Sequence, residues 1–250
     1  MLMMRRSRVI GLTALVALGI CLSRVFATYG PAATEQWYPD PSVVSAAIGE
    51  PPSDARVLFD GTSLHNWRSR DGEAPAWVIL DGMLVVTPGS GDLITRDTFC
   101  DVQLHLEWMV PELASGSRGQ NRSNSGVFLQ DRYEIQILDS YQNPTYVNGQ
   151  AGALYKQARP MVNASRPAGQ WQSYDILFRA PRFDGKALME PAYITVLHNG
   201  VLVQYHTAVK GDTVYWGEPS YTSHGCAPLR LQDHWSQVYF RNIWIRSLTQ

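Results

Sequence analysis

The chain has 250 residues, of which 45% are hydrophobic and 17% are charged, and its formal net charge is -1. This size and composition suit one large β domain, and the near-zero charge with no basic run argues against nucleic acid and against an anionic membrane surface as partners. Composition does not predict the oligomeric state.

The N-terminus has the pattern of a secretory signal peptide. Arginines occur at positions 5, 6 and 8, an apolar run covers residues 9–22, and Val25-Phe26-Ala27 resembles a cleavage site. The apolar run is shorter than the roughly 20 residues that span a bilayer, so cleavage is favoured over a membrane anchor. We therefore expect residues 1–27 to be a signal peptide and the protein to be exported to the periplasm or the exterior, by a route left open.

Residues 28–54 are rich in Pro, Ala and Ser. Tyr38-Pro39-Asp40-Pro41 and Glu50-Pro51-Pro52 would interrupt any regular element. We interpret this stretch as a leader and residues 55–250 as the domain.

Short strands dominate the remainder. The expected strands are 57–59, 77–80, 83–86, two within 124–139, 102–110, 174–179, 193–197, 201–205 and 238–245. Asp81-Gly82 and Asn199-Gly200 predict tight hairpin turns. Because no segment after residue 27 shows a helical period over ten or more residues, the prediction is an all-β sandwich of two antiparallel sheets.

Three loops exceed the usual connection length, and loops of that size are commonly functional. They are 111–124, 140–169 and 210–228. Cys100 and Cys226 are the two cysteines that remain after residue 27. In an oxidising compartment they could form a disulfide or stay as two buried thiols, and the sequence leaves both options open.

The most informative segment is 124–139, which reads as two strands. With a side-chain period of two, Glu134 and Gln136 project from one face of the second strand, while Ile135 and Ile137 project from the other. A bulge near Leu138 would return Asp139 to the Glu134 face. A carboxylate and an amide would then line one wall of a groove, unless that face is simply solvated.

The spacing Glu-x-Gln-x-x-Asp resembles the Glu-x-Asp-x-x-Glu strand of jelly-roll β-glucanases, whose carboxylate pair performs double displacement. Here the middle position is the amide Gln136 and the second acid is the shorter Asp139, so that chemistry is weakened. Lys156, in the loop after this strand, could present a cation to a developing oxyanion, or be an ordinary surface lysine. His234 follows Asp233, and such a histidine is more often structural than catalytic.

A divalent metal ion is a further option, without assigned ligands, and no organic cofactor is expected. Candidate donors are scattered at His105, Glu107, His206 and His224, and none has the fixed spacing of a metal motif.

Several segments together resemble the 3-keto-disaccharide hydrolase family. They are Leu58 to Trp67, Asn124 to Phe128, Tyr133 to Asp139, Gly152 to Gln157, Asn199 to Val203, Leu231 to His234 and Phe240 to Arg246, in the order of the family's motifs between Arg56 and Leu248. The resemblance implies a concanavalin-like jelly roll, export, and action on glycosides whose C3 hydroxyl has been oxidised to a ketone. Trp235 stands where the family usually has Gly, which would place a ring beside the groove or change the backbone locally.

The resemblance implies that Glu134, Gln136, Asp139, Lys156 and His234 lie in the groove. From it we expect catalytic roles for Glu134, Asp139, Lys156 and His234. Substrate-binding roles are expected for Asn124, Gln136, Tyr141, Gln232 and Asp233.

The expected reaction starts with removal of the proton on C2, which the C3 ketone acidifies, and continues with elimination at C1 and rehydration. Glu134 would be the base, Lys156 or a metal ion the electrophile, and His234 or Asp139 the acid. The alternatives are a carbohydrate-binding, lectin-like module without turnover and an ordinary β-glucanase-like glycosidase.

Overall fold

A computed structural model describes residues 30–112 and 117–248. By contacts the chain divides into two units, residues 1–44 and 45–250. In the first unit the described residues form one 3-10 turn, η1 (Pro31–Thr34), and an irregular, mostly exposed stretch. The expected signal peptide lies outside the described residues. No helix in the described part is both long enough and apolar enough to cross a membrane.

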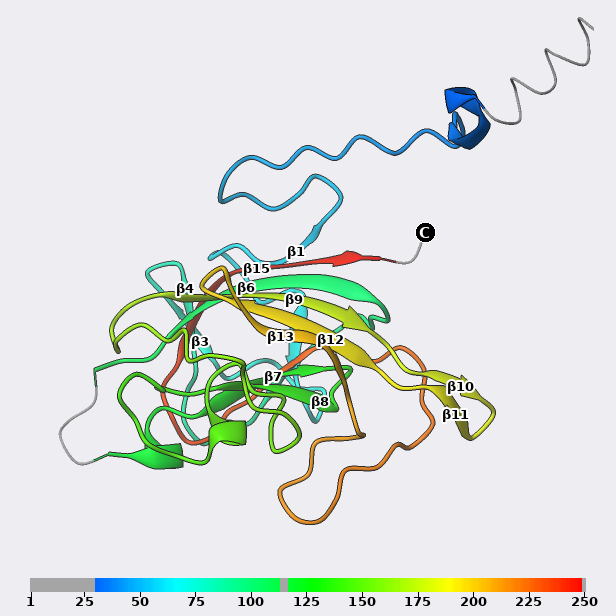
Figure 1. The fold of residues 1–250 in the computed structure, drawn as a ribbon. Helices are drawn as coiled ribbons and strands as arrows, with labels where there is room; N and C mark the ends of the chain where they lie inside the picture. The colour runs from blue at the N-terminus through cyan, green and yellow to red at the C-terminus, as the bar shows by residue number, and fades with distance from the viewer. Residues whose placement is uncertain (1–29, 113–116, 249–250) are drawn as a thin grey trace, which may run out of the picture. The chain divides into compact units, whose positions relative to one another are not determined.

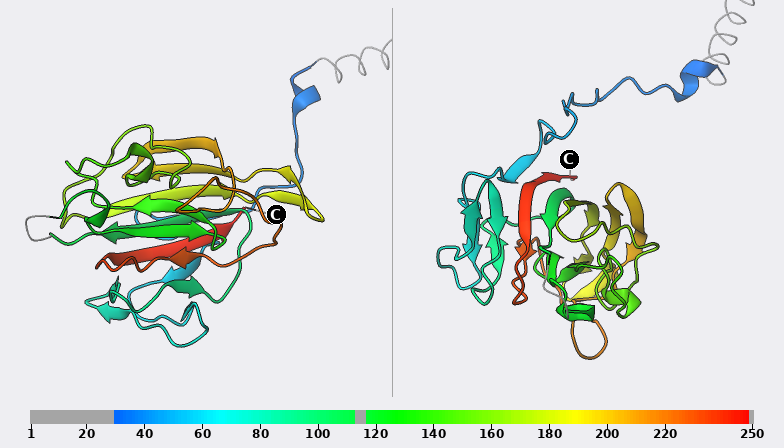
Figure 2. Two further views of the ribbon diagram at one scale, coloured as in Figure 1. Left: turned by 90° about the horizontal axis from the view of Figure 1, so that it is seen from below. Right: turned by 90° about the vertical axis from the view of Figure 1, so that its left-hand side faces the viewer.

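The second unit contains a large sheet, a smaller sheet and a two-stranded ribbon, and all neighbouring strands are antiparallel (Figures 1 and 2). The large sheet has the order β13-β12-β9-β6-β15-β4-β3, with β1 also paired to β15. Its strands are β1 (Arg56–Phe59), β3 (Val78–Leu80), β4 (Met83–Val85), β6 (Val102–Met109), β9 (Gln172–Arg179), β12 (Tyr193–His198), β13 (Val201–Ala208) and β15 (Tyr239–Ser247).

The smaller sheet has the order β2-β5-β14-β7-β8. Its strands are β2 (Trp67–Ser69), β5 (Leu93–Thr95), β14 (Arg230–Leu231), β7 (Ser125–Leu129) and β8 (Tyr133–Ile137). The ribbon pairs β10 (Arg182–Asp184) with β11 (Ala187–Glu190), and two further 3-10 turns are η2 (Gly119–Asn121) and η3 (Val147–Gly149). The predicted all-β sandwich of two antiparallel sheets is confirmed.

Alternating residues of the central strands build the core. In β6, Leu104, Leu106 and Trp108 are buried, and the residues between them face outward. In β8, Ile135 and Ile137 are fully buried in the same core. The inward faces of both sheets are therefore apolar, as the period-two patterns predict.

The two expected hairpins are present. Asp81 and Gly82 join β3 to β4, Asn199 and Gly200 join β12 to β13, and all four have positive φ, the conformation that this kind of turn requires. The sequence did not indicate β2, β5, β10, β11 or β14, because strands of two to four residues are too short to show a period by themselves. The equally short β3 and β4 were indicated by the Asp81-Gly82 turn between them.

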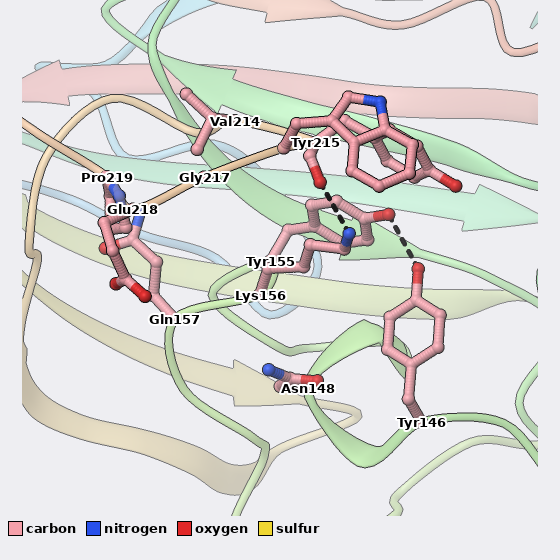
Figure 3. A pocket seen from close by; sticks show the side chains of 11 residues that line it. Tyr146, Asn148, Tyr155, Lys156, Gln157, Val214, Tyr215, Gly217, Glu218 and Pro219 are labelled. Carbon is pink, nitrogen blue, oxygen red and sulfur yellow. Dashed lines mark hydrogen bonds between the residues drawn. The ribbon is translucent and has the colours of Figure 1, made fainter.

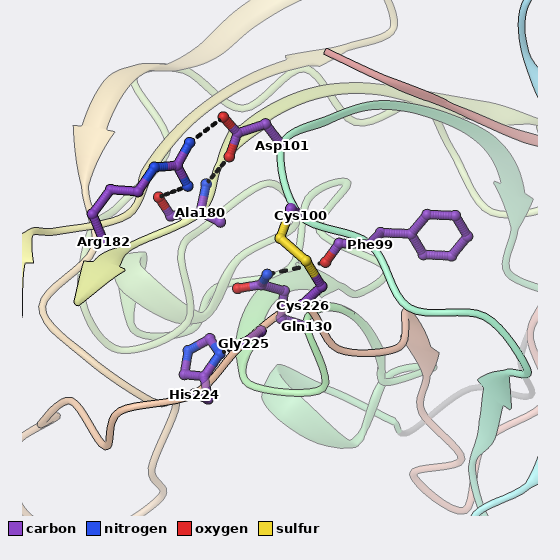
Figure 4. The surroundings of a disulfide bond; sticks show 9 residues. All are labelled: Phe99, Cys100, Asp101, Gln130, Ala180, Arg182, His224, Gly225 and Cys226. Atoms are coloured by element: carbon purple, nitrogen blue, oxygen red, sulfur yellow. Dashed lines mark hydrogen bonds and ion pairs between the residues drawn. A yellow bond between two sulfur atoms is a disulfide. The ribbon is translucent and has the colours of Figure 1, made fainter. Parts of the chain in front are cut away.

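A disulfide joins Cys100, directly before β6, to Cys226, at the end of the third long loop, with the two Cα atoms 4.7 Å apart (Figure 4). Beside it, Phe99 and Ala227 form a β-bridge, and Gln130 Nε2 donates to the Phe99 carbonyl. Of the two options that the sequence left open, the cysteines pair. The bond ties one end of the 210–228 loop to the edge of the sandwich.

Candidate active site

The outer face of the smaller sheet carries three rows of polar side chains. In the first row, Glu134 of β8 lies opposite Phe128 of β7, and Phe128 lies opposite Arg230 of β14. Directly opposed residues of antiparallel strands project from the same face, so a carboxyl, a ring and a guanidinium stand side by side.

The second row contains Gln136, Gly126 and Gln232. Gln136 lies opposite Gly126, and the Gln232 amide N–H donates to the Gly126 carbonyl. Asn124, two residues before Gly126, and His234, two residues after Gln232, complete the face. The alternations Asn124-x-Gly126-x-Phe128 and Arg230-x-Gln232-x-His234 thus turn every second side chain to one side.

Gly126 makes room for the Glu134 carboxyl. A Cβ atom at this position would lie 2.6 Å from Glu134 Oε1 and 2.9 Å from Phe128 Cε2. Both distances are too short for real contacts, so a side chain here would displace Glu134. Gly126, on β7, therefore leaves the space that the Glu134 carboxyl occupies.

The Glu134 side chain is buried although it belongs to the outer face. Glu134 is 4% exposed, and this burial raises the pKa of its carboxyl to about 8. The nearby Arg230 cation lowers the pKa and so partly offsets the effect of burial. A carboxyl group that takes up a proton near neutral pH can act as a general base or a general acid.

Arg230 is held by two carboxylates and one ring. Its Nη1 lies 2.8 Å from Asp92 Oδ2, its Nε pairs with Asp131, and its guanidinium carbon lies 3.4 Å from the Phe128 ring centroid. These contacts immobilise the cation, and among the described residues Nη2 has no hydrogen-bond partner.

The Gln136 amide connects Glu134 to the neighbouring amides. One amide position lies 2.9 Å from Glu134 Oε1, and the other lies 3.2 Å from Asn124 Oδ1 and Gln120 Oε1. Since the two amide atoms are distinguished only by their partners, the ionised carboxylate requires the nitrogen beside it, whereas the protonated carboxyl can donate to the oxygen. Either form of Glu134 therefore has a hydrogen-bond partner.

Two loop segments cover this face. Residues 152–155 run along the edge of β8, where Tyr155 N–H donates to the Glu134 carbonyl and Gly152 N–H to the Gln136 carbonyl. From the 210–228 loop, Thr213 Oγ1 accepts from the Glu134 N–H across 3.0 Å. The expectation that the long loops are functional is consistent with this placement, because they turn an open sheet face into a cavity.

The cavity over the polar face, which we call the inner hollow, has a volume of about 260 Å³. It is lined by Asn124, Phe128, Glu134, Gln136, Tyr155, Thr213, Tyr215, Arg230, Gln232 and His234. Five residues that the sequence predicted for the site therefore meet here: Asn124, Glu134, Gln136, Gln232 and His234. Gln232 Oε1 is buried and has no hydrogen-bond partner among the described residues.

The other predicted residues lie elsewhere. Asp139 Oδ2 lies 2.6 Å from Arg122 Nε. The Asp233 carboxylate accepts from the backbone N–H groups of Gly91 and Trp235. Neither Asp139, Asp233 nor the exposed Tyr141 lines the inner hollow.

Lys156 lines a second cavity of about 500 Å³, which we call the outer hollow (Figure 3). This cavity is lined by Tyr146, Asn148, Tyr155, Lys156, Gln157, Val214, Tyr215, Trp216, Gly217, Glu218 and Pro219. Lys156 Nζ donates to the Tyr215 carbonyl across 2.7 Å and lies 4.1 Å from the centroid of that residue's ring.

Trp235 adopts the left-handed conformation, with φ +57°, that favours glycine. Its exposed ring packs against Gly89, where a Cβ atom would lie 2.6 Å from Cζ3. The backbone at this position therefore keeps the geometry that favours glycine. The tryptophan ring lies outside the inner hollow, because it is not among the residues that line it.

The sequence interpretation missed Phe128, Tyr155, Thr213, Tyr215 and Arg230 as lining residues. The alternation of Arg230 with Gln232 and His234 was a usable signal for the arginine. The tyrosines and the threonine come from loops, where no periodicity predicts direction.

Histidines and acids are also present away from the hollows. On the outer face of the large sheet, His105 Nδ1 lies 2.7 Å from Asp175 Oδ1, and Asn242 donates to Glu107. Among the described residues there is no group of three or more His, Cys, Asp or Glu side chains arranged to hold a metal ion. The expectation of a divalent ion therefore stays a prediction.

Comparison with known proteins gives concordant matches. The family model described as 3-keto-alpha-glucoside-1,2-lyase-like domain matches residues 54–246. A 3-keto-disaccharide hydrolase from Bacteroides thetaiotaomicron is 24% identical over 230 residues, which cover 77% of this chain and 78% of the relative.

Two crystal structures of candidate glycosyl hydrolases from Parabacteroides distasonis are also similar. One is 44% identical with a TM-score of 0.83, covering 87% of this chain and 96% of its own. The other is 21% identical with a TM-score of 0.58, covering 78% of this chain and 94% of its own, and supports the fold alone.

Proposed function

The chain belongs to the 3-keto-alpha-glucoside-1,2-lyase-like domain family, and on that basis we propose that it is a glycoside-cleaving enzyme acting on sugars oxidised to a ketone at C3. The observation that carries the proposal is the buried Glu134 carboxyl, with its pKa raised to about 8, on the wall of a sugar-sized hollow. This group has the proton affinity that removal of a hydrogen next to a ketone requires.

In the proposed reaction, the base takes the C2 proton, and the electron pair of that C–H bond forms an enolate with the C3 ketone. The enolate then forms the C1–C2 double bond, and the bond from C1 to the glycosidic oxygen breaks with its electron pair on that oxygen, which receives a proton. Water adds to C1 and a proton returns to C2, so the sum is hydrolysis. The description of the family as 1,2-lyase-like refers to the same two positions, C1 and C2, between which this elimination takes place.

We assign the base to Glu134 and the stabilisation of the enolate oxygen to the Arg230 guanidinium, whose Nη2 is available. A fixed cation beside developing negative charge lowers the barrier without reorganisation. The arginine replaces Lys156 in this role, because Lys156 Nζ lies in the outer hollow against the Tyr215 carbonyl.

Among the lining groups, we assign the proton for the departing oxygen to the His234 imidazole or the Tyr155 phenol. The pKa of Tyr155 is raised, chiefly by burial, so the phenol keeps its proton. The variants His234→Gln and Tyr155→Phe distinguish the two groups. Loss of the true donor should slow cleavage of a 3-keto-disaccharide, which has a poor leaving group, more than cleavage of an aryl 3-keto-glycoside, which has a good one. Loss of the other group should slow both substrates alike.

Double displacement by a carboxylate pair is not supported by this geometry. That chemistry needs two carboxyl groups about 5 Å apart, and the second candidate, Asp139, pairs with Arg122 and does not line the inner hollow.

The test is to incubate the protein without the expected signal peptide with 3-keto-trehalose or 3-keto-sucrose, and in parallel with the unoxidised disaccharides. We expect sugar release from the oxidised substrates alone. Release from the unoxidised sugars would instead favour a glycosidase of the ordinary kind, and binding of unoxidised glycans without any turnover would favour a lectin-like module.

A further inference from the structure

The inner and outer hollows share two side chains. Tyr155 and Tyr215 line both, so the two cavities meet at these rings. We infer that the outer hollow is the binding site for the sugar that leaves, and that a disaccharide spans both cavities with its glycosidic oxygen beside Tyr155. This inference rests on the proposed function, because it takes the C3-oxidised ring to lie over Glu134.

The two cavities differ in chemistry. The inner hollow holds the raised-pKa carboxyl and the fixed guanidinium, which are the groups that a reacting ring needs. The outer hollow holds four aromatic rings, from Tyr146, Tyr155, Tyr215 and Trp216, with amides and Lys156 between them. Glu218 also lines this cavity. The combination of rings, amides and charged groups suits a sugar ring with an apolar C–H face and several hydroxyl groups.

The aromatic rings at the entrance are unusually exposed for their size. Trp216 is 82% exposed and Tyr215 is 62% exposed, and their rings stand edge to face with centroids 5.0 Å apart. Exposed aromatic surface beside a cavity marks a ligand contact, because covering it removes apolar area from water.

The interior of the outer hollow is held in a fixed arrangement. Tyr146 and Tyr155 point toward each other and share a hydrogen bond of 2.7 Å between their hydroxyl oxygens (Figure 3). Lys156 is anchored to the Tyr215 carbonyl and lies 6.0 Å from the rings of both other tyrosines. Hence the hydrogen bond of Lys156 joins the 140–169 loop to the 210–228 loop beside the cavity. The groups that would bind sugar hydroxyls therefore need little reorganisation when a sugar enters.

The test compares a 3-keto-disaccharide with methyl 3-keto-α-glucoside, whose leaving group is too small to reach the outer hollow. Trp216→Ala should lower kcat/KM for the disaccharide by roughly tenfold, mainly through KM, and change the methyl glycoside by less than about twofold. Tyr205→Ala, which removes a ring of similar exposure (72%) from β13 on the large sheet, should change neither. Equal losses on both substrates with Trp216→Ala would overturn the inference while leaving the proposed function intact.

A second measurement does not depend on turnover. Unoxidised glucose is titrated into the wild type, Trp216→Ala and Tyr205→Ala while the heat of binding is recorded by calorimetry, with far-UV circular dichroism to confirm the fold of each variant. The inference expects a saturable change in the wild type and in Tyr205→Ala that is absent in Trp216→Ala. No saturable change in the wild type, or the same change in all three, contradicts it. Failure of the wild type to cleave either keto sugar, with glucose binding retained, would reject the proposed function and with it the leaving-group role, and would leave the outer hollow as a sugar-binding site only.

Discussion

Glu134 and Arg230 face the same hollow from strands that are not neighbours, with the Phe128 ring between them in one row of the sheet. The arginine pairs with Asp92 and Asp131, and no ion pair joins it to Glu134. The carboxyl is thus buried near a cation without being neutralised by it. This separation explains how the pKa of Glu134 stays high beside an arginine.

The rate of cleavage should therefore depend on pH through Glu134. If the ionised carboxylate is the base, kcat/KM rises about tenfold per pH unit below pH 8 and levels off above it. A pH–rate profile on a 3-keto-disaccharide measures this, with Glu190→Gln, an exposed carboxyl on β11, as the control that keeps the profile. A rate that is already constant from pH 5 upward would contradict the assignment.

Folding stability should respond to pH in the opposite direction. The folded-state pKa of Glu134 is above its ordinary value of 4.5, so the native state holds a proton that the unfolded state releases. Between about pH 4.5 and 8 this lowers the free energy of unfolding by up to about 1.4 kcal/mol per pH unit. Denaturant unfolding of the wild type and of Glu134→Gln, at several pH values, should show that only the wild type carries this loss.

The difference between wild type and variant is the quantity to compare, because His198 acts in the opposite sense. Burial lowers the pKa of this core histidine to about 4, so its contribution to stability is lost as pH falls from 6.5 toward 4. Identical pH dependence in Glu134→Gln and wild type would show that the carboxyl is not buried as described.

Gly126→Ala should reduce activity strongly while leaving the fold in place. The added methyl group would meet Glu134 Oε1 at 2.6 Å, so the carboxyl must move out of the row. A misplacement of a reacting group by about 1 Å costs about a hundredfold in rate. Gly225→Ala is the matched control, since a Cβ atom there has no neighbour within 4 Å, and steady-state rates with a thermal melt compare the two. Full activity in Gly126→Ala would remove Glu134 from the mechanism.

Replacing both Cys100 and Cys226 by Ser should loosen the loop that closes the hollows. The cross-link spans 126 residues, and a closure of that length stabilises the fold by about 5 kcal/mol in the chain-entropy account. We expect a lower unfolding midpoint, together with faster proteolytic cleavage within residues 210–228 than elsewhere. Reductant should reproduce both effects in the wild type and have none in the variant. Cleavage rates that are equal in both proteins would mean that Thr213 and the backbone contacts hold the loop by themselves.

Periodicity predicted the two site residues that lie on β8. Glu134 and Gln136 face the hollow because β-strands alternate their side chains, and this could be read from the order of the residues. Arg230 was available to the same reasoning. Its strand β14 has only two residues, so the alternation is seen only when Gln232 and His234, which follow the strand, are counted with Arg230.

Positions on loops were not predictable in this way. Lys156 follows Glu134 by 22 residues, yet its amine lies in the outer hollow, because a hydrogen bond to the Tyr215 carbonyl fixes it there. Asp139 was expected on the Glu134 face, and its pairing with Arg122 depends on a contact from η2 that no local pattern reveals. Tertiary contacts, not strand geometry, decide where such residues point.

Removal of the C2 proton by Glu134 is the central claim, and substitution of that hydrogen by deuterium tests it most directly. A 3-keto-disaccharide carrying deuterium at C2 is compared with the ordinary substrate, at saturating concentration, in the wild type and in Glu134→Gln. We predict that deuterium slows the wild type by about twofold or more, and that Glu134→Gln retains about one hundredth of the rate or less. Equal rates for the two substrates, or an unchanged rate in Glu134→Gln, would contradict the account.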